Sequence, residues 1–347
     1  MMYRISNQST GESHEREEEM RSIGSNIGRL VAVPLAAALV WAAGSGASTA
    51  GEKGTLGVSM PTIQGPWYTA LLYGVTDEAT KLGYDTVILD AGGYAHADKQ
   101  VTHVANLTVQ KVKAILMDPA NPASFDGVVG QAQAAGIPVI GTGSPIVASD
   151  VAADAAASSS HCNIGKELAV GARILLPNGG TIAALAGPPG AFWSGDRWRC
   201  FKEAVAGSNI KIVAEQNSEQ EIAGALNLAN DFLQRYPDID LLYGADDTYG
   251  VGAARAVQGA GKCGKVKVLF AVLGPAAEEL MRAGCVDYVV AQQTVLIGRI
   301  AVRLADQLAS GKTLDKKLIE VDLIPVTIDN VDAIDKTKMQ QPAGWKP

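Results

Sequence analysis

The stretch that decides the fold is LGVSMPTIQGPWYTALLYGVTDEATKLGYDTVILD, residues 56–90. It opens and closes on short apolar runs, LGVSM and TVILD, each bounded by polar residues or glycine. Between these runs Leu71, Val75 and Ala79 recur every four residues, which gives one apolar stripe along a helix. The stretch therefore predicts a strand, a helix over Trp67–Leu82 and a second strand, the unit from which doubly wound α/β sheets are built.

The same alternation of short apolar runs and longer helical stretches continues along the chain. Several of the runs are apolar throughout, as expected where helices cover both faces of a parallel sheet. The predicted strands are Leu56–Met60, Thr86–Asp90, Ala114–Met117, Pro138–Gly141, Thr181–Ala186, Lys211–Ala214, Leu241–Ala245, Val266–Ala271 and Tyr288–Ala291. The predicted helices include Trp67–Leu82, Ala123–Ala135, Arg197–Ala206, Ile222–Arg235 and Ile297–Ala309. About ten strands exceed one sheet of this kind, so the sequence predicts two doubly wound parallel-sheet lobes.

Ligands of such sheets bind outside the carboxyl ends of the strands, where loops from several units converge. In this sequence those segments are rich in glycine, proline, aromatic residues, carboxylates and amides. They are Met60–Tyr68, Ala91–His96, Asp118–Pro122, Gly141–Pro145, Gly187–Arg197, Asp246–Tyr249 and Gln292–Gln293. A pocket lined in this way suits one small polar ligand that also presents apolar surface.

Length and charge limit the class of protein. The chain has 347 residues, of which 47% are hydrophobic and 19% charged, which is enough for two lobes with buried cores. Its formal net charge of −7 and the absence of a run of Lys and Arg argue against a nucleic-acid partner.

The first fifty residues have the pattern of an export signal. Residues 1–19 are polar and charged, so we infer that Met20 is the true start and that this segment is an erroneous extension. Arg21 and Arg29 then precede an apolar run over 30–43 and a small-residue segment that ends at Ala50. This order is typical of a signal peptide over residues 1–50, cleaved near Ala50, and it predicts a periplasmic protein. The alternative is an uncleaved membrane anchor, although the run is short for a span.

The four cysteines are Cys162, Cys200, Cys263 and Cys285, and none of them forms a Cys-x-x-Cys pair. Cys263 and Cys285 each precede a predicted strand. If those strands are parallel neighbours, their leading ends lie close together and a disulfide can join the two residues. Buried free thiols are the alternative.

Two motifs suggest an enzyme but do not fit one. Gly259–Lys265 reads GAGKCGK, which resembles a phosphate-binding loop. Such loops follow a strand and open a helix, whereas this one follows the predicted helix Val251–Gln258 and precedes a strand. The histidines show no metal-like spacing. We therefore predict no catalysis, no metal site and no cofactor.

The strand-end segments resemble those of type I periplasmic binding proteins, the ribose-binding type, from Thr55 to about Val326. Gln64–Tyr68 is similar to the first-loop ligand contact of that family, Ala114–Pro119 to its third strand, and Asp196–Phe201 to its Arg-x-x-x-Phe stretch. Ala245–Asp247 and Val290–Gln292 resemble two further strand ends of the pocket. With the aromatic residues at the strand ends, the resemblance implies the ligand-binding residues Trp67, Tyr68, Tyr94, Asp118, Trp193, Arg197, Asp246 and Gln292.

The resemblance also implies two lobes joined by a three-stranded hinge, with crossings near Ser160, Gln292 and Leu323. The N-terminal lobe would comprise 51–160 and 293–322, and the C-terminal lobe 161–292 and 323–347. Such a protein closes on its ligand and presents it to an inner-membrane partner, either a sensor histidine kinase or an ABC permease. A repressor of the same fold would need a DNA-binding segment where the leader lies.

The chain departs from sugar-binding members of the family at two places. Gly143 and Ser144 stand where those proteins carry Asp-Arg, and Ala271–Gly274 lacks their Asp. Losing these charged groups removes hydrogen bonds that specify a sugar.

A narrower resemblance agrees with these departures. Asp90–Tyr94 and the tail Pro342–Pro347 are similar to the periplasmic trimethylamine N-oxide sensor-partner proteins. Aromatic side chains, among them Tyr249, could then surround a methylated nitrogen. The sequence thus favours an amine-oxide ligand, with a sugar-binding component of an ABC transporter as the alternative.

Overall fold

The first strand–helix–strand unit forms as residues 56–90 predict. It comprises β1 (Gly54–Met60), α1 (Pro66–Leu82) and β2 (Tyr84–Asp90), and the two strands are parallel neighbours. The computed structural model describes residues 51–144, 146–148 and 151–347. The predicted signal peptide, residues 1–50, lies outside the described residues.

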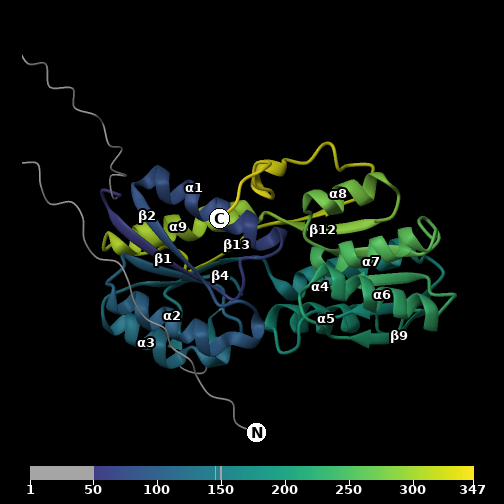
Figure 1. Ribbon diagram of the computed structural model, residues 1–347, viewed down its shortest axis with the longest axis horizontal. Coiled ribbons are helices and arrows are strands. Elements are labelled where there is room, and N and C mark those ends of the chain that lie inside the picture. The colour runs from purple at the N-terminus through teal and green to yellow at the C-terminus, as the bar shows by residue number, and fades with distance from the viewer. Residues whose placement is uncertain (1–50, 145, 149–150) are drawn as a thin grey trace, which may run out of the picture. The chain divides into compact units, whose positions relative to one another are not determined.

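The first sheet has the strand order β13-β7-β4-β3-β1-β2, and each neighbouring pair in it is parallel. We call this sheet with its helices the first lobe. Figure 1 shows α1 and α9 on one face of the sheet and α2 and α3 on the other. The elements not yet bounded are β3 (Ala114–Met117), β4 (Val139–Gly143), β7 (Ala155–Ser158), β13 (Leu318–Glu320), α2 (Ala97–Val109), α3 (Asp126–Ala134), α9 (Thr294–Ala309), the short helices η1 (Tyr94–His96) and η2 (Pro122–Ser124), and the hairpin strands β5 (Val147–Ala148) and β6 (Val151–Ala152).

The second sheet has the order β14-β12-β11-β10-β8-β9, and we call it with its helices the second lobe. Its neighbours are parallel except for β14, which runs antiparallel to β12. Helices α4 and α5 pack together, as do α6 and α7, with α8 against α7. Its elements are β8 (Gly180–Leu185), β9 (Ile210–Gln216), β10 (Leu241–Gly244), β11 (Lys267–Ala271), β12 (Tyr288–Gln292), β14 (Leu323–Val326), α4 (His161–Leu175), α5 (Phe192–Val205), α6 (Ile222–Arg235), α7 (Asp247–Gly259) and α8 (Pro275–Arg282).

These two sheets confirm the predicted α/β fold class. Residues 48–347 cluster as one unit, within which the chain passes from one sheet to the other after β7, after β12 and after β13. The interiors of the central strands β1, β3, β4, β8, β10, β11 and β12 are buried, as the predicted continuous runs require, whereas the edge strands β2 and β9 are mostly half-buried or exposed.

Three helices begin three or more residues earlier than the sequence predicts. α9 begins at Thr294 rather than Ile297. α5 begins at Phe192 rather than Arg197, and α7 begins at Asp247 rather than Val251. The start of α5 has no side-chain cap, and Gly195 in its first turns disfavours helix, so no local signal marks it. The prediction also missed β7, whose sequence AAAS has little strand propensity, and the short strands β13 and β14. The loop Gly259–Lys265 does lie between α7 and β11, the order that a phosphate-binding loop lacks.

Both cysteine pairs form disulfides. Cys263 is bonded to Cys285, as predicted from the parallel neighbours β11 and β12. The second disulfide, Cys162–Cys200, joins α4 to α5 and was not predicted, because two helices far apart in sequence give no spacing signal.

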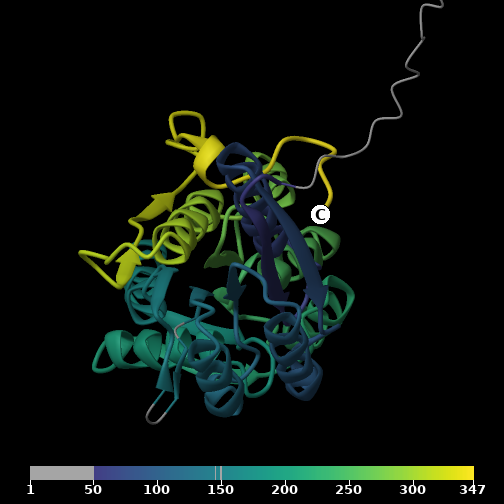
Figure 2. The same ribbon diagram turned by 90° about the vertical axis from the view of Figure 1, so that its left-hand side faces the viewer.

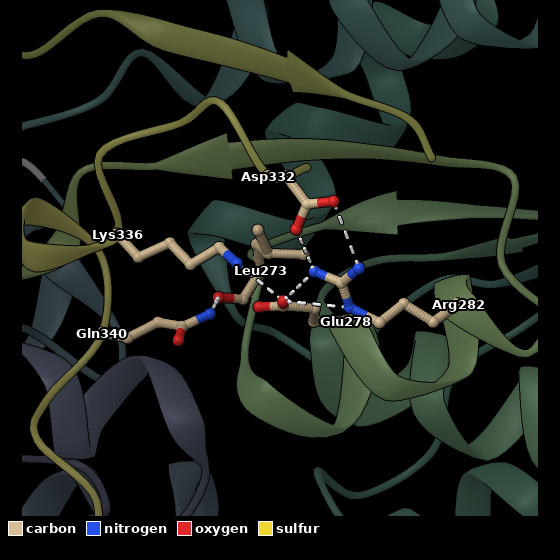
Figure 3. A network of polar contacts seen from close by, with 6 residues as sticks. All are labelled: Leu273, Glu278, Arg282, Asp332, Lys336 and Gln340. Atoms are coloured by element: carbon tan, nitrogen blue, oxygen red, sulfur yellow. Dashed lines mark hydrogen bonds and ion pairs between the residues drawn. The ribbon is translucent and has the colours of Figure 1, made fainter. Parts of the chain in front are cut away.

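The C-terminal segment lies across the second lobe and ends on the first. Figure 3 shows Lys336 paired with Glu278 of α8, and Asp332 paired with Arg282, each at 2.6 Å, while the Gln340 amide donates to the Leu273 carbonyl oxygen. The segment ends beside α1 (Figure 2), where the Trp345 and Tyr73 rings meet edge to face with centroids 5.5 Å apart. The predicted C-terminal lobe segment 323–347 therefore touches both lobes.

Among the described helices, none combines the length and the apolar character that a membrane span requires.

Gly165 lets α4 approach α5 closely, and this contact can be tested. A Cβ at Gly165 would lie 2.1 Å from the Arg197 backbone oxygen, whereas a Cβ at the exposed Gly195 of α5 would meet nothing within 4 Å. We expect Gly165→Ala to lower the free energy of unfolding by about 1–3 kcal/mol through overpacking. Gly195→Ala should leave it unchanged or raise it by up to about 1 kcal/mol, since alanine favours helix. Urea denaturation followed by circular dichroism measures both, and equal effects would contradict this account.

Candidate functional site

The strand ends of the two lobes enclose a cavity of about 20 Å³, room for about one water molecule. All of the predicted ligand-binding residues except Gln292 line it: Trp67, Tyr68, Tyr94 and Asp118 from the first lobe, and Trp193, Arg197 and Asp246 from the second. The other lining residues are Gly143, Ser144, His161, Gln220 and Val272.

Asp118, at the end of β3, is the acceptor contributed by the first lobe. The Tyr68 hydroxyl donates to its Oδ2 at 2.7 Å, and the Ser144 amide donates to its Oδ1 at 2.9 Å. The buried Gln100 amide donates to the backbone oxygens of Ser59 and Asp118, and so ties the ends of β1 and β3 together. Burial raises the pKa of Asp118 to about 6, against the opposing effect of the donors from Tyr68 and Ser144.

Asp246 is the corresponding carboxylate of the second lobe, at the end of β10. Its Oδ1 caps α7 by accepting from the amides of Thr248 and Tyr249 at 2.9 and 3.3 Å, and Gln220 donates to its Oδ2. Burial raises the pKa of Asp246, and the Arg197 charge acts in the opposite direction. The same cap fixes the early start of α7.

Arg197 supplies positive charge to the cavity. Its Nη1 donates to the Ala245 carbonyl oxygen at 2.9 Å, and its guanidinium carbon lies 4.7 Å from the centroid of the Trp193 ring. Its Nε is buried and has no hydrogen-bond partner among the described residues. Burial lowers the pKa of Arg197, and Asp246 acts to raise it. Because guanidinium remains protonated in proteins, the side chain keeps its charge and has a spare donor.

His161 joins this cluster, although the sequence gave it no role. Its Nδ1 lies 3.4 Å from Arg197 Nη2, and its Nε2 lies 3.5 Å from the Ser144 hydroxyl oxygen. Arginine only donates, so Nδ1 accepts and the ring proton sits on Nε2. Burial, and then the Arg197 charge, hold the pKa of His161 well below its usual value, so the ring is neutral. One feature of the sequence could have identified His161: it directly follows the crossing between the lobes that was predicted at Ser160. Its spacing from other histidines and cysteines gave no indication.

Aromatic side chains join the two lobes across the cavity. The Tyr68 and Tyr94 hydroxyls hydrogen-bond to each other, and the Trp193 indole donates to the Tyr94 hydroxyl at 2.8 Å. The Trp67 indole nitrogen is buried, and no described residue accepts from it. Between these rings the cavity has room for about one water molecule.

Gly143 makes room for the Trp67 ring. It has a φ of +78°, and a Cβ there would lie 2.5 Å from Trp67 Cη2. Gly143 is one of the positions at which the sequence analysis predicted a departure from the sugar-binding pattern. An indole occupies the space that a side chain at position 143 would take.

Two residues from the sequence analysis lie apart from the cavity. Gln292 is buried at the end of β12 and its Nε2 has no partner in the described part of the chain, but it is not a lining residue. Tyr249 is buried on α7 and donates to the Ser218 carbonyl oxygen at 2.6 Å, so it is not part of the aromatic lining. The sequence analysis placed Tyr249 in the loop before the helix, whereas α7 begins at Asp247 and includes Tyr249.

The described residues contain no group of three or more His, Cys, Asp or Glu side chains placed to hold a metal ion.

The Gly143–Trp67 contact predicts that alanine substitution lowers stability by different amounts at two glycines with left-handed backbones. Gly190 has a φ of +75°, close to that of Gly143, but a Cβ there would meet nothing within 4 Å. Both alanine variants should lose about 1–2 kcal/mol of stability from backbone strain. Gly143→Ala should lose at least about 1 kcal/mol more, because the Trp67 ring must move. Urea denaturation gives the stabilities and tryptophan fluorescence reports the ring; equal losses in the two variants would refute the contact.

Comparison with known proteins identifies relatives that are similar to this chain in sequence and in fold. A family model described as a periplasmic binding protein domain matches residues 56–313. The ribose import binding protein RbsB of Bacillus subtilis is 28% identical over 76% of this chain and 84% of its own length. The D-allose-binding periplasmic protein of Escherichia coli is 30% identical over 77% and 90%, and the periplasmic protein TorT of the same species is 25% identical over 83% and 82%. A solute-binding protein of Agrobacterium vitis, solved with D-fucose, superposes with a TM-score of 0.77 at 24% identity, covering 83% of this chain and 100% of that one.

Proposed function

Because the chain belongs to the periplasmic binding protein domain family, we propose that it is a periplasmic solute-binding protein for a monosaccharide or similar polyol, which it presents to an ABC permease. The observation that carries the proposal is the buried set Asp118, Asp246 and Arg197 between aromatic rings from both lobes. Family membership also agrees with the predicted absence of catalysis.

The cavity offers the contacts that a polyol needs. A sugar hydroxyl both donates and accepts, so it can donate to a buried carboxylate and accept from a guanidinium. Asp118 and Asp246 supply the acceptors, and the free Nε of Arg197 and indole nitrogen of Trp67 supply donors. Hydrogen bonds to ionised groups are the stronger ones, and the ring faces can cover the apolar side of the ligand.

Closure of the lobes accounts for the small cavity. The Trp193–Tyr94 hydrogen bond crosses between the lobes and closes the site. Opening about the three crossings would break this contact and expose the strand ends, and a ligand would replace the hydrogen bonds that the side chains make to one another. This is hinge closure of the kind that two-domain binding proteins use.

The favoured amine-oxide ligand is not supported. The ribose- and allose-binding relatives are 28% and 30% identical to this chain, whereas TorT is 25% identical. In addition, the Arg197 guanidinium already lies over the Trp193 ring, the face that a methylated cation would use. The sugar-binding alternative therefore fits better, with an ABC permease as partner in place of a sensor kinase.

A ligand panel tests the proposal. Isothermal titration of the purified protein with D-ribose, D-allose, D-fucose, D-arabinose, myo-inositol and trimethylamine N-oxide should show one-site binding to a sugar or polyol. Thermal shift provides a second readout, since a ligand of the native state raises the melting temperature. Binding of trimethylamine N-oxide alone would overturn the proposal.

The raised pKa of Asp118 predicts a pH dependence of ligand binding. With a pKa of about 6, this carboxyl is ionised above pH 6 and protonated below it. An acceptor that becomes protonated loses its charge-assisted hydrogen bond, so affinity for the sugar should fall as pH is lowered from 7 to 5. Titration of the Asp118→Asn variant over the same range is the control. Its affinity should be weaker at pH 7 and should change less with pH; an unchanged pH profile would remove Asp118 from the site.

A further inference from the structure

We propose that the Cys162–Cys200 disulfide is a positioning element of the ligand site, which holds His161 and Arg197 together at the point where the chain enters the second lobe. The proposal rests on the ligand site proposed above. Cys162 directly follows His161 at the start of α4, and Cys200 lies three residues after Arg197 on α5.

Three contacts join the first turns of α4 to α5. The His161 and Arg197 side chains meet at 3.4 Å, the disulfide joins Cys162 to Cys200, and Gly165 packs against the Arg197 backbone. Residues three apart lie on the same side of a helix, so the disulfide and the glycine contact share one line. The guanidinium, the imidazole and the bond between the helices therefore form one group.

Without the disulfide, the first turn of α4 would be the least stable part of this group of contacts. The first amides of a helix have no partner within it, and terminal turns open most easily. Here the preceding residues 159–160 link β7 of the first lobe to α4 of the second, so hinge motion acts directly on His161. Ser160 caps the helix through Asn163 at 3.3 Å, a long hydrogen bond. The disulfide is the covalent connection between this turn and the helix that carries Arg197 and Trp193.

The second disulfide supplies a matched control. Cys263–Cys285 lies in the same lobe and closes a comparable stretch of chain, with a separation of 22 residues against 38. It joins the leading ends of β11 and β12, at the opposite end of these strands from the cavity. Loss of either disulfide should destabilise the fold to a similar extent, because the stabilisation varies slowly with loop length. Only loss of Cys162–Cys200 should affect the site.

The test compares Cys162→Ala/Cys200→Ala with Cys263→Ala/Cys285→Ala, using D-ribose and D-allose as probes in isothermal titration. We expect the first variant to bind the sugar about tenfold or more weakly, the equivalent of one misplaced charged hydrogen bond, and the second to keep its affinity. Equal affinities in the two variants, or equal losses, would overturn the proposal.

A readout without ligand separates this proposal from the proposed function. The His161 ring can be followed by NMR during a pH titration and assigned with His161→Gln. In the unmodified protein and in the Cys263/Cys285 variant the ring should stay neutral well below pH 6.5, because it is buried beside Arg197. In the Cys162/Cys200 variant its pKa should rise toward 6.5. An unchanged His161 titration would refute the positioning role even if no sugar binds.

Reduction provides a second route if the Cys162/Cys200 variant does not fold. In the Cys263→Ala/Cys285→Ala protein, a phosphine reductant can open only the Cys162–Cys200 bond of the already folded chain. The same weakening of sugar binding and the same rise in the His161 pKa should follow. Full affinity and an unchanged His161 titration after reduction, verified by thiol counting, would contradict the proposal.

Discussion

The charge of Arg197 is the interaction on which the rest of the site depends. The guanidinium is buried, and its field acts on the pKa values of Asp118, Asp246 and Asp247 and on that of His161. A buried charge is costly unless other groups compensate it. Asp246 and Asp247, which lie on the same lobe as Arg197, provide most of that compensation, and Asp118 of the first lobe adds to it. The pKa values of these carboxylates and the neutrality of the imidazole are therefore coupled through the Arg197 charge.

The sequence was sufficient to predict the fold class and most of the cavity lining. The strand interiors are apolar runs in the sequence, and polar residues such as Asp118 and Asp246 follow these runs. Because the strands are parallel, these polar residues converge at one edge of each sheet. The start of α5 was not predictable from local sequence, because no cap marks it. His161 and the Cys162–Cys200 bond were missed because their partners are far away along the chain, and only helix packing brings them together.

The ligand preference shows how an inference from single positions depends on the side chains around them. By resemblance, Gly143 stands where sugar-binding members carry a charged residue, and the sequence alone made this an argument against a sugar. The structure adds that the freed space holds the Trp67 ring, while Asp118, Asp246 and Arg197 keep buried charge in the cavity. The effect of a glycine at such a position therefore depends on which neighbouring side chain fills the space. A single position of the sequence does not reveal that neighbour.

The path of the C-terminal segment has a practical consequence for fluorescent reporters. The chain ends shortly after Trp345, which rests on Tyr73 of the first lobe, although the segment is anchored to α8 of the second through Lys336 and Asp332. A fluorescent protein fused after Pro347 would thus begin beside α1 and follow the first lobe. A dye meant to follow the second lobe needs a different attachment point, such as the exposed Gly195 on α5.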